Sequence, residues 1–246
     1  MTKILDVQNL SLYSGNVTLL IDISFTLEQG QIMTVFGPSG SGKSLLCKSI
    51  LNLQNQNLHK TGKILFMNKD ISHQNNLKSV RGKTISIMFQ SVSKSLNPML
   101  TLGQHLVQVS KRNNDDLLMD VGFSNPIEIL QKYPHQVSGG ELSRFGLALA
   151  LAPNPRLLIL DEAFTSIDDN LKTKFVNLIK NLVHQKQLSI ILVTHDLDIL
   201  DKLSDNYIVM QNGEIIETNN NLSTSSNSEY LKNSISSFKR LYNDDF

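Results

Sequence analysis

Cysteine and net charge are both scarce in this 246-residue sequence. Its single cysteine, Cys47, excludes an intramolecular disulfide and leaves no cysteine cluster for zinc or an iron–sulfur centre. The formal net charge is only +1, so the chain lacks the basic excess that releases counterions from nucleic acid. These absences favour cytosolic chemistry and argue against a dedicated nucleic-acid binder.

Long apolar runs are absent as well. No stretch approaches the roughly 18 to 20 apolar residues that a spanning helix needs. The start of the chain, 1–6, lacks the apolar segment of a secretory signal. We therefore expect that any work at a membrane requires other subunits that span it. With 40% hydrophobic residues, the chain can still bury the core of one α/β domain with a subdomain.

Short apolar segments alternate with helical ones along the chain. Segments 4–10 and 21–27 alternate in polarity and predict paired strands. Further strands are predicted at 32–36, 62–67, 84–89, 157–160 and 189–194, and helical regions at about 44–53 and 100–132. This order predicts an α/β fold with a mostly parallel sheet. The polar stretch 219–228 predicts a linker, and 230–246 a short amphipathic helix.

A glycine-rich loop follows the predicted strand 32–36 and matches the G-x-x-x-x-G-K-S spacing. Its glycines let the backbone fold around phosphates, Lys43 reaches the β and γ oxygens, and the Ser44 hydroxyl can ligate Mg²⁺. A chance glycine turn is a much weaker interpretation, because all the fixed positions match between a strand and a helix. The predicted nucleotide-binding residues of this loop are Gly37, Pro38, Ser39, Gly40, Ser41, Gly42, Lys43 and Ser44.

Polar side chains follow two other predicted strands. The Asp161 carboxylate can reach Mg²⁺, and Glu162, one residue further on, can polarise an attacking water. Such a pair alone is more typical of a solvated turn, but a phosphate loop in the same chain favours the metal site. His195 follows 189–194, where strands of α/β sheets face ligands, so its imidazole can contact a γ-phosphate. The other histidines are expected to be structural or solvated: His59, His73, His105, His135 and His184.

A second anion site is predicted at Ser138-Gly139-Gly140, which Glu141 follows. A serine hydroxyl, free backbone N–H groups and the positive end of a helix together suit an anion. Because the chain already has one phosphate loop, we expect this second site to serve another chain.

Taken in their order along the chain, these motifs resemble those of the nucleotide-binding subunit of an ABC transporter, and the resemblance covers about residues 4–217. The matching parts are Tyr13 near the adenine, the Walker A loop 37–44, the Q-loop Gln90, the signature 137–141, Walker B 157–161, Glu162, the D-loop 165–168 and the switch His195. The resemblance implies a P-loop NTPase (RecA-like) core, an N-terminal antiparallel β subdomain and an inserted α-helical subdomain. It implies a nucleotide-binding domain over 1–218, with the helical subdomain at about 91–153, and a linker and tail over 219–246.

The resemblance also implies an ATPase that uses ATP and Mg²⁺. Lys43, Glu162 and His195 take the catalytic roles, and Ser44, Gln90 and Asp161 serve the metal. Tyr13 stacks on adenine. In a head-to-tail dimer, the signature of one subunit closes over the nucleotide of the other, with contacts implied for Ser138, Gly139, Gly140, Glu141 and Asp168.

Three segments resemble a narrower branch, the D-type ATPase of dipeptide, oligopeptide and nickel import systems. They are 89–98 with its Leu-Asn-Pro ending, the approach 132–135 to the signature, and 42–47 after the phosphate loop. The branch implies two transmembrane permease subunits, a second ATPase subunit that is a distinct paralogue, and an extracytoplasmic solute-binding protein. It places the chain peripherally on the cytoplasmic face of the membrane, with no nucleic-acid partner. The solute itself stays open between nickel, a nickel chelate and peptides.

Two alternatives explain less of the sequence. A soluble ABC ATPase acting on nucleic acid or ribosomes needs coiled coils, zinc hooks or tandem domains, and a P-loop kinase or GTPase leaves Ser-Gly-Gly and His195 unexplained. The chain also departs from the family pattern. Glu141 stands where glutamine is commoner, Leu149 replaces an arginine, and Ala163-Phe164 replaces Pro-Thr. We expect Glu141 to weaken dimer closure unless a cation neutralises it.

Overall fold

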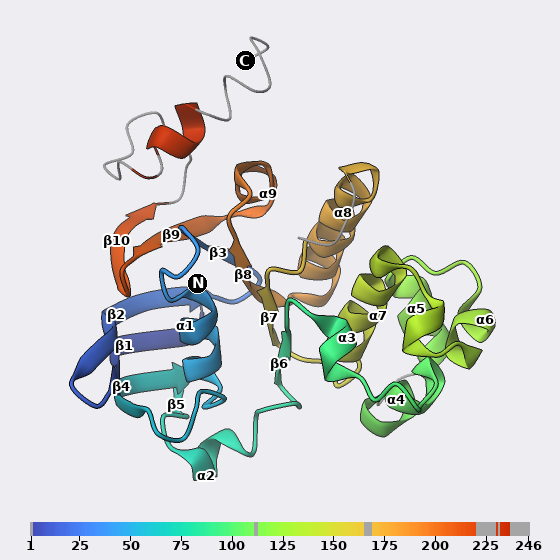
Figure 1. Ribbon diagram of the computed structural model, residues 1–246, viewed down its shortest axis with the longest axis horizontal. Helices are drawn as coiled ribbons and strands as arrows, with labels where there is room; N and C mark the ends of the chain where they lie inside the picture. The colour runs from blue at the N-terminus through green and yellow to red at the C-terminus, as the bar shows by residue number, and fades with distance from the viewer. Residues whose placement is uncertain (1, 111–112, 165–168, 220–229, 231, 237–246) are drawn as a thin grey trace.

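Two β-sheets and a lobe of helices make up the structure (Figure 1). The computed structural model describes residues 2–110, 113–164, 169–219, 230 and 232–236. The strands are β1 (Lys3–Ser14), β2 (Val17–Glu28), β3 (Ile32–Phe36), β4 (His59–Phe66), β5 (Lys69–Asp70), β6 (Ile85–Met88), β7 (Leu157–Asp161), β8 (Ser189–Thr194), β9 (Asn206–Gln211) and β10 (Glu214–Asn219). The α-helices are α1 (Lys43–Ile50), α2 (Gln74–Leu77), α3 (Val92–Ser95), α4 (Leu102–Val109), α5 (Asn114–Asp120), α6 (Pro126–Gln131), α7 (Gly139–Leu151), α8 (Asp169–Lys186) and α9 (Leu197–Leu203).

The smaller sheet is antiparallel and has the strand order β2-β1-β4-β5. Its first hairpin confirms the strand pair predicted at 4–10 and 21–27, and both strands extend further to meet at Gly15. Gly15 has a φ of 55°, which glycine adopts at low cost in such a turn. This sheet is the N-terminal antiparallel subdomain expected from the sequence.

The larger sheet has the order β10-β9-β3-β8-β7-β6. The neighbours from β9 to β6 pair in parallel, and only β10 pairs antiparallel, with β9. Every residue of β3, β7 and β8 is buried, which is typical of parallel strands covered on both faces. The mostly parallel sheet predicted from the sequence is therefore confirmed.

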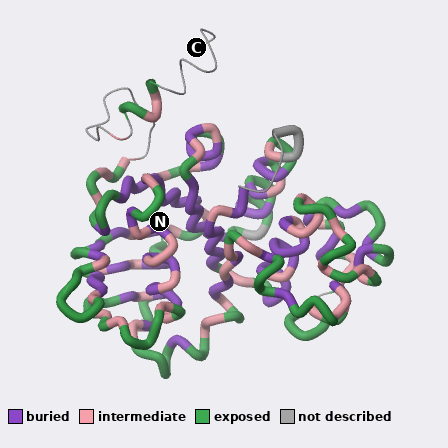
Figure 2. Tube along the Cα trace, in the orientation of Figure 1, coloured by how far each residue is buried: buried purple, intermediate pink, exposed green. Residues whose placement is uncertain are grey.

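Two hydrophobic cores cover the two faces of the larger sheet. Alternate residues of β7 belong to different cores: Leu157 and Ile159 pack with α1 and the small sheet, whereas Leu158 and Leu160 pack with α7 and α8. This alternation follows from the strand period of two. The buried residues concentrate on the strands between the two halves (Figure 2). As a result, α1 and α7 lie on opposite faces of the sheet.

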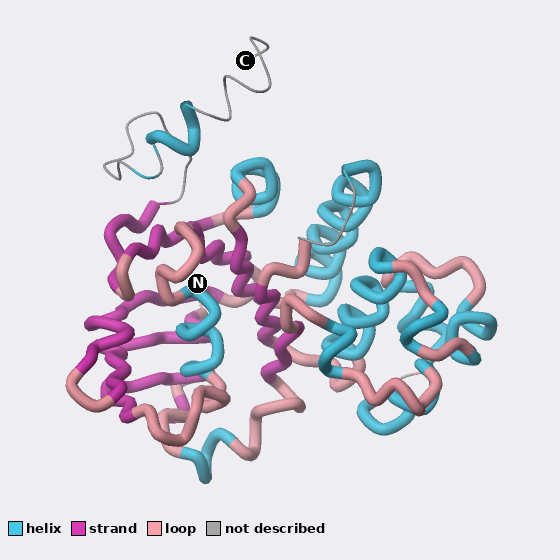
Figure 3. The backbone as a smooth tube through the Cα atoms, in the orientation of Figure 1, coloured by secondary structure: helices cyan, strands magenta, loops and turns pink. Residues whose placement is uncertain are grey.

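A lobe of helices, α3 to α7, is inserted between β6 and β7 and lies to one side of the strands (Figure 3). The predicted helical region at 100–132 is confirmed, and it consists of three short helices, α4, α5 and α6. Four N-cap side chains accept hydrogen bonds from backbone N–H groups of the turn that follows: Thr101, Asn113, Asn125 and Ser138. The inserted helical subdomain is thus confirmed, whereas its exact boundaries stay a prediction.

Two described residues of the C-terminal segment, Tyr230 and Ile235, pack against the buried cluster that contains Phe36. The Tyr230 ring lies 5.7 Å, between centroids, from the ring of Phe36, the last residue of β3, in a tilted arrangement. Of the predicted linker 219–228 only residue 219 is described, and of the predicted helix 230–246 residues 230 and 232–236 are described and are helical. None of the helices in the described ranges combines the length and the apolar character needed to cross a membrane.

Candidate active site

Predicted site residues follow four neighbouring strands at one edge of the parallel sheet. Gly37 follows β3, His195 follows β8 and Glu162 follows β7, and the ends of these strands are paired in register. Gln90 lies two residues beyond the end of β6, which pairs with β7. The carboxyl edge of a parallel sheet is where α/β proteins bind ligands. The fold therefore brings the phosphate loop, the carboxylates, Gln90 and His195 to one place.

The phosphate loop lies so close to the sheet that two of its positions admit only glycine. A Cβ on Gly37, whose φ is 151°, would lie 2.2 Å from the carbonyl oxygen of Met210. Gly42 caps α1 with a φ of 101°, and a Cβ there would lie 2.9 Å from Leu20 Cδ2. Gly40 faces open space instead. The loop is therefore fixed at its two ends and open at its tip.

Lys43 lies inside this loop and is only 5% exposed. Its ammonium donates hydrogen bonds to the carbonyl oxygens of Gly37 at 2.9 Å and Pro38 at 2.8 Å. Burial lowers the pKa of Lys43, and the nearby charges of Glu162 and Asp161 act in the opposite direction. The Ser41 hydroxyl is buried too and has no hydrogen-bond partner within the described part of the chain. A buried ammonium and an unsatisfied hydroxyl in one loop fit a phosphate group.

Ser44 and Asp161 meet across the site, where the Ser44 hydroxyl donates to Asp161 Oδ1 at 2.7 Å. Burial raises the pKa of Asp161, while the hydrogen bond from Ser44 lowers it. Among the described residues no group of three or more His, Cys, Asp or Glu side chains could hold a metal. Two protein oxygens beside a phosphate site nevertheless fit Mg²⁺, which takes few protein ligands and completes its shell with phosphates and water.

Glu162 joins the residues on either side of it. Its carboxylate accepts a 2.6 Å hydrogen bond from Gln90 Nε2, and its other oxygen lies 3.8 Å from His195 Nδ1. Its φ is 53°, the left-handed region, and its backbone N–H donates to the Val193 carbonyl at 3.1 Å. Uncommon backbone conformations of this kind cluster at functional sites. The structure thus brings Gln90, Glu162 and His195 together, as expected from their order in the sequence.

Tyr13 lies on β1, in the hairpin that contacts the phosphate loop through Leu20 of β2. Its neighbour Leu12 is the residue paired with Leu20. The Tyr13 ring is half-buried, and its centroid lies 6.2 Å from that of the exposed His59 on β4. His59 was expected to be structural or solvated, and its position before the predicted strand 62–67 gave no signal that it pairs with Tyr13 across two strands. The stacking role of Tyr13 stays a prediction, and His59 joins it as a second ring at the same position.

The signature residues are not brought to the phosphate loop of their own chain. Ser138 is the N-cap of α7, and Gly139, Gly140 and Glu141 form its first turn. Ser138 caps α7 and Lys43 begins α1, and these two helices pack on opposite faces of the sheet. This separation agrees with the expectation that the signature serves a second chain.

Glu141, at the position where glutamine is commoner in the family, has a structural role that was not predicted from the sequence. Its carboxylate accepts from the backbone N–H and from the hydroxyl of Ser138, both at 2.8 Å, while its own N–H donates back to the Ser138 hydroxyl. These hydrogen bonds lower the pKa of Glu141, and the cations Lys132 and Arg144 add to the effect. The effect of Glu141 on dimer closure stays a prediction, which the charges of Lys132 and Arg144 weaken.

Three further predictions concern residues beside the site. Cys47 is fully buried, and burial raises the pKa of its thiol well above the usual value, in agreement with a packing role. Phe164, at the departure Ala163-Phe164, packs edge-on against Phe175 of α8 at 5.0 Å between centroids. The D-loop 165–168, with Asp168, lies outside the described residues.

Comparison with known proteins gives the same assignment as the geometry. The family model described as "ABC transporter" matches residues 20–165. The chain belongs to the ABC transporter family. Among curated members of this family, it is 34% identical to the oligopeptide transport ATP-binding protein OppD of Bacillus subtilis, with 88% of this chain and 66% of OppD covered. It thus spans about two thirds of the length of that relative.

Other members of the ABC family give similar values. The dipeptide transport ATP-binding protein DppD of Bacillus subtilis is 35% identical, with 88% of this chain and 70% of DppD covered. The metal-staphylopine import system ATP-binding protein CntD of Staphylococcus aureus is 33% identical, with coverages of 81% and 78%. The resemblance to the ATP-binding subunits of peptide and metal-chelate importers is thereby confirmed.

Solved structures confirm the ABC fold. The structure of cbiO1 from Clostridium perfringens superposes with a TM-score of 0.77 at 24% identity, covering 98% of this chain and 94% of the other. A dimeric ATP-binding cassette in a post-hydrolysis state gives a TM-score of 0.76 at 23% identity, with coverages of 88% and 98%. At these identities the likeness concerns the fold alone, and the individual site residues stay predictions.

Proposed function

We propose that this chain is an ATP-binding and ATP-hydrolysing subunit that energises an importer of peptides or metal chelates. The observation that carries the proposal is the convergence of Lys43, the Ser44–Asp161 pair, Glu162 and His195 at one edge of the sheet. The named relatives are the ATP-binding proteins of oligopeptide transport, dipeptide transport and metal-staphylopine import. They favour this proposal over a soluble ABC ATPase acting on nucleic acid or ribosomes.

The phosphate loop is the proposed binding site for the β- and γ-phosphates of ATP. Lys43 exchanges its backbone carbonyl partners for phosphate oxygens, which are stronger acceptors for a partly desolvated ammonium. Tyr13 supports the adenine, with His59 beside it. Ser44 and Asp161 are the proposed ligands of Mg²⁺, to which Gln90 adds a contact, and the ion when bound neutralises charge that develops on the phosphates.

Glu162 is the proposed base for the attacking water. Its carboxylate orients the water and takes one proton as the water oxygen bonds to the γ-phosphorus and the bond to the β-phosphate oxygen breaks. Gln90 holds one carboxylate oxygen at 2.6 Å, and His195, on the other side, is placed to donate a hydrogen bond to the γ-phosphate. ADP and phosphate are the products.

A second ATPase subunit, predicted to be a distinct paralogue, completes the site. The support is that α7, which Ser138 caps, packs on the face of the sheet opposite to α1, which follows the loop, and that a cassette with the same fold is dimeric. In the head-to-tail pair, the Ser138 hydroxyl and the first N–H groups of α7 contact the γ-phosphate held by the partner, and Asp168 contributes from the D-loop.

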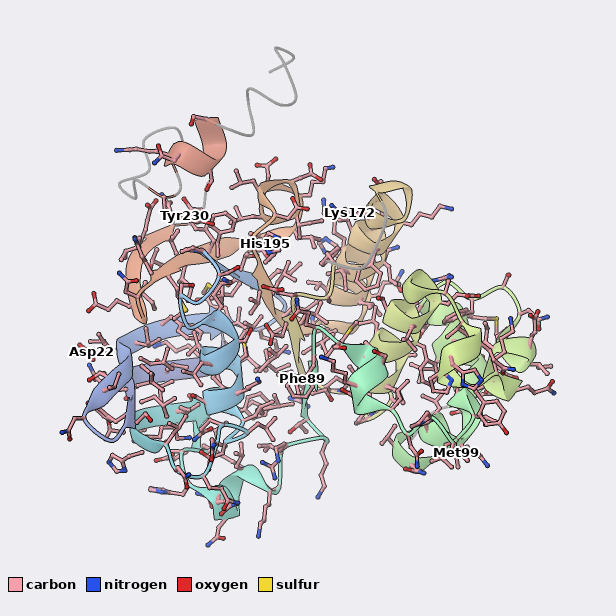
Figure 4. The ribbon with its side chains drawn as sticks, in the orientation of Figure 1. Asp22, Phe89, Met99, Lys172, His195 and Tyr230 are labelled. Carbon is pink, nitrogen blue, oxygen red and sulfur yellow. The ribbon has the colours of Figure 1, made fainter. Side chains whose placement is uncertain are left out.

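Two transmembrane permease subunits are the proposed partners on the membrane side. An apolar groove of about 410 Å³ runs between β6 and the helical lobe, and its lining includes Phe89, Val92, Leu96, Val109 and Leu149. Phe89, labelled in Figure 4, directly precedes Gln90, so a helix in this groove would lie next to the site. The groove supports contact with a permease helix. We place the chain peripherally on the cytoplasmic face, with cargo chosen by the permeases and an extracytoplasmic binding protein.

Replacement of the proposed base tests the assignment. Glu162→Gln keeps the hydrogen-bonding shape but loses the proton acceptor, so we expect ATP binding to persist and hydrolysis to fall at least about 100-fold. Phosphate release and the binding of a fluorescent ATP analogue measure the two effects. Glu128→Gln, an exposed change on α6, is the matched control and should retain parental rates. Hydrolysis near the parental rate in Glu162→Gln would remove Glu162 from this role.

A further inference from the structure

An ion pair outside the predicted motifs ties α8 to the loop that carries His195. Lys172, in the first turns of α8, donates from Nζ to Asp196 Oδ2 at 3.0 Å. Both side chains are about three-quarters buried, with exposures of 26% and 28%. Figure 4 labels Lys172 on α8 and His195 beside α9 at this end of the sheet. A partly buried pair of this kind is screened less by solvent than an exposed one.

Besides the bond that its carbonyl oxygen accepts from the Leu200 N–H within α9, three hydrogen bonds hold Asp196, and they differ in reach. Its backbone N–H donates to Thr194 Oγ1 at 3.0 Å, and its Oδ1 accepts from the backbone N–H of Asp198 at 3.0 Å, which caps α9. Both of these join residues two positions apart. Of the three, the bond to Lys172 alone reaches another element, so it fixes the loop relative to α8.

The same helix also supports the loop that carries Glu162. Phe175, three residues after Lys172, packs against Phe164, which lies two residues after Glu162. One helix therefore contacts both loops, through an ion pair on one side and an aromatic contact on the other. Between these loops lies the 3.8 Å separation of Glu162 Oε1 and His195 Nδ1.

The position of Lys172 near the N-terminus of α8 is electrostatically unfavourable, and the ion pair with Asp196 offsets this. A cation in the first turns of a helix faces the positive end of the helix dipole, which is unfavourable. Asp196, at the N-terminus of α9, is favourably placed for the same reason. The carboxylate thus serves α9 as a cap and α8 as a counterion.

We propose that Lys172 is a positioning residue, which acts through Asp196 to hold His195 opposite Glu162. The inference rests on the proposed ATPase function, and it extends the site to a residue that no motif contains. Removal of the pair leaves ATP-binding groups in place but lets the His195 loop move relative to Glu162. Small displacements of a catalytic group lower the rate of the chemical step more than they lower binding.

The test compares Lys172→Met with Lys172→Arg in the full chain. We expect Lys172→Met to lower kcat for ATP hydrolysis about five- to tenfold with an unchanged KM for ATP, and Lys172→Arg to restore most of the rate. Lys202→Met is the matched control, because it breaks the ion pair between Lys202 and Asp198 at 2.8 Å. Both residues of this pair lie on α9, so it does not connect α9 to another element. Lys202→Met should retain the parental kcat.

A second variant separates positioning from loss of folding. Asp196→Asn keeps an oxygen that can cap α9 but loses the charge, so we expect it to lower kcat as much as Lys172→Met does. The double variant with both Lys172→Met and Asp196→Asn should show no further fall in kcat. Equal thermal midpoints in all variants show that the fold is intact. A parental kcat in Lys172→Met, or losses that multiply in the double variant, would overturn the inference. An inactive parental chain would instead overturn the proposed function.

Discussion

The strand edge and the helical lobe hold their functional groups by different means. At the edge, Gly37, Glu162 and His195 follow strands that are buried at every residue and paired in register. In the lobe, Ser138 and Glu141 depend on hydrogen bonds between their own side chains and backbone at the start of α7. The edge is therefore set by the core, whereas the signature is set locally.

The two regions also differ in what their surfaces leave uncovered. The lobe exposes large apolar side chains, among them Met99 at 79%, Val107 at 70% and Ile127 at 64%. The edge instead presents charged and polar groups that are partly desolvated, such as Lys43 and Asp161. The difference suggests that chemistry belongs to the edge and contact with other chains to the lobe. Substitutions at the edge should therefore change ATP binding and folding stability together, whereas substitutions at the signature should change one without the other.

The largest expected effect is that of Gly37→Ala. A Cβ there meets the Met210 carbonyl at 2.2 Å, and the φ of 151° disfavours any L side chain. We expect the free energy of unfolding to fall by about 2–4 kcal/mol and ATP binding to be lost. Urea denaturation without nucleotide measures the first effect, and binding of a fluorescent nucleotide measures the second.

Gly15→Ala is the matched control for this change. Gly15 also has a positive φ, 55°, but a Cβ there meets nothing within 4 Å. We expect a loss of about 1 kcal/mol, which is the backbone cost alone, with ATP binding retained. If Gly37→Ala and Gly15→Ala lower the free energy of unfolding equally, the close packing of the phosphate loop against the sheet does not contribute to stability. The proposed difference between the strand edge and the helical lobe would then be wrong.

An intermediate effect is expected at Glu141. Glu141→Ala removes half of the capping box and should lower the free energy of unfolding by about 1 kcal/mol, whereas Glu141→Gln retains the box. Because hydrogen bonds lower the pKa of the folded carboxyl group, its contribution is complete above the ordinary glutamate pKa. It fades as the pH falls through the lower folded value. The difference between the parent and Glu141→Ala should therefore shrink in acid.

The same variants test the role of the charge. Since Lys132 and Arg144 lie near the carboxylate, we expect Glu141→Gln to retain the parental ATPase rate and ATP affinity. A clear rise in either quantity would show that the charge opposes closure in spite of these cations. In that case the signature would be tuned by charge and not by local geometry.

Sequence patterns predicted the edge well because contiguous residues determine it. A strand, a glycine loop and a helix in succession place Lys43, and the strand before Asp161 places both carboxylates, so the order of motifs was enough. The buried alternation of β7 between two cores follows from the same strands. The individual roles at this edge stay predictions.

Contacts between distant segments could not be predicted in the same way. The Tyr13–His59 ring pair joins β1 to β4, and the Lys172–Asp196 ion pair joins α8 to the loop before α9. Neither pair has a fixed spacing in sequence, and each depends on how elements pack in space. The helical region at 100–132 was predicted, but not its division into three helices, since short capped helices and one longer helix have similar apolar periods.

The smallest expected effect lies at the far end of α1, away from the strand edge. Lys60 on β4 donates from Nζ to the Ser49 carbonyl in the last turn of that helix at 3.1 Å. Burial lowers the pKa of Lys60 to about 8, while the Asp70 charge acts in the opposite direction. The unfolded chain thus binds this proton more tightly than the folded one, so stability should rise between about pH 8 and pH 10.4.

Lys60→Met should lack this rise, because methionine does not titrate. Chemical denaturation at pH 7.5 and pH 10 measures the effect, and Lys63→Met, exposed on the same strand, accounts for the other groups that titrate in this range. We expect the stability difference between the parent and Lys60→Met to move in favour of the parent at pH 10. ATP binding to Lys60→Met should persist, since the edge holds the phosphate loop through Gly37 and Gly42, at the opposite end of α1. Loss of binding in this variant would show that the edge depends on the distant end of the helix as well as on the strands.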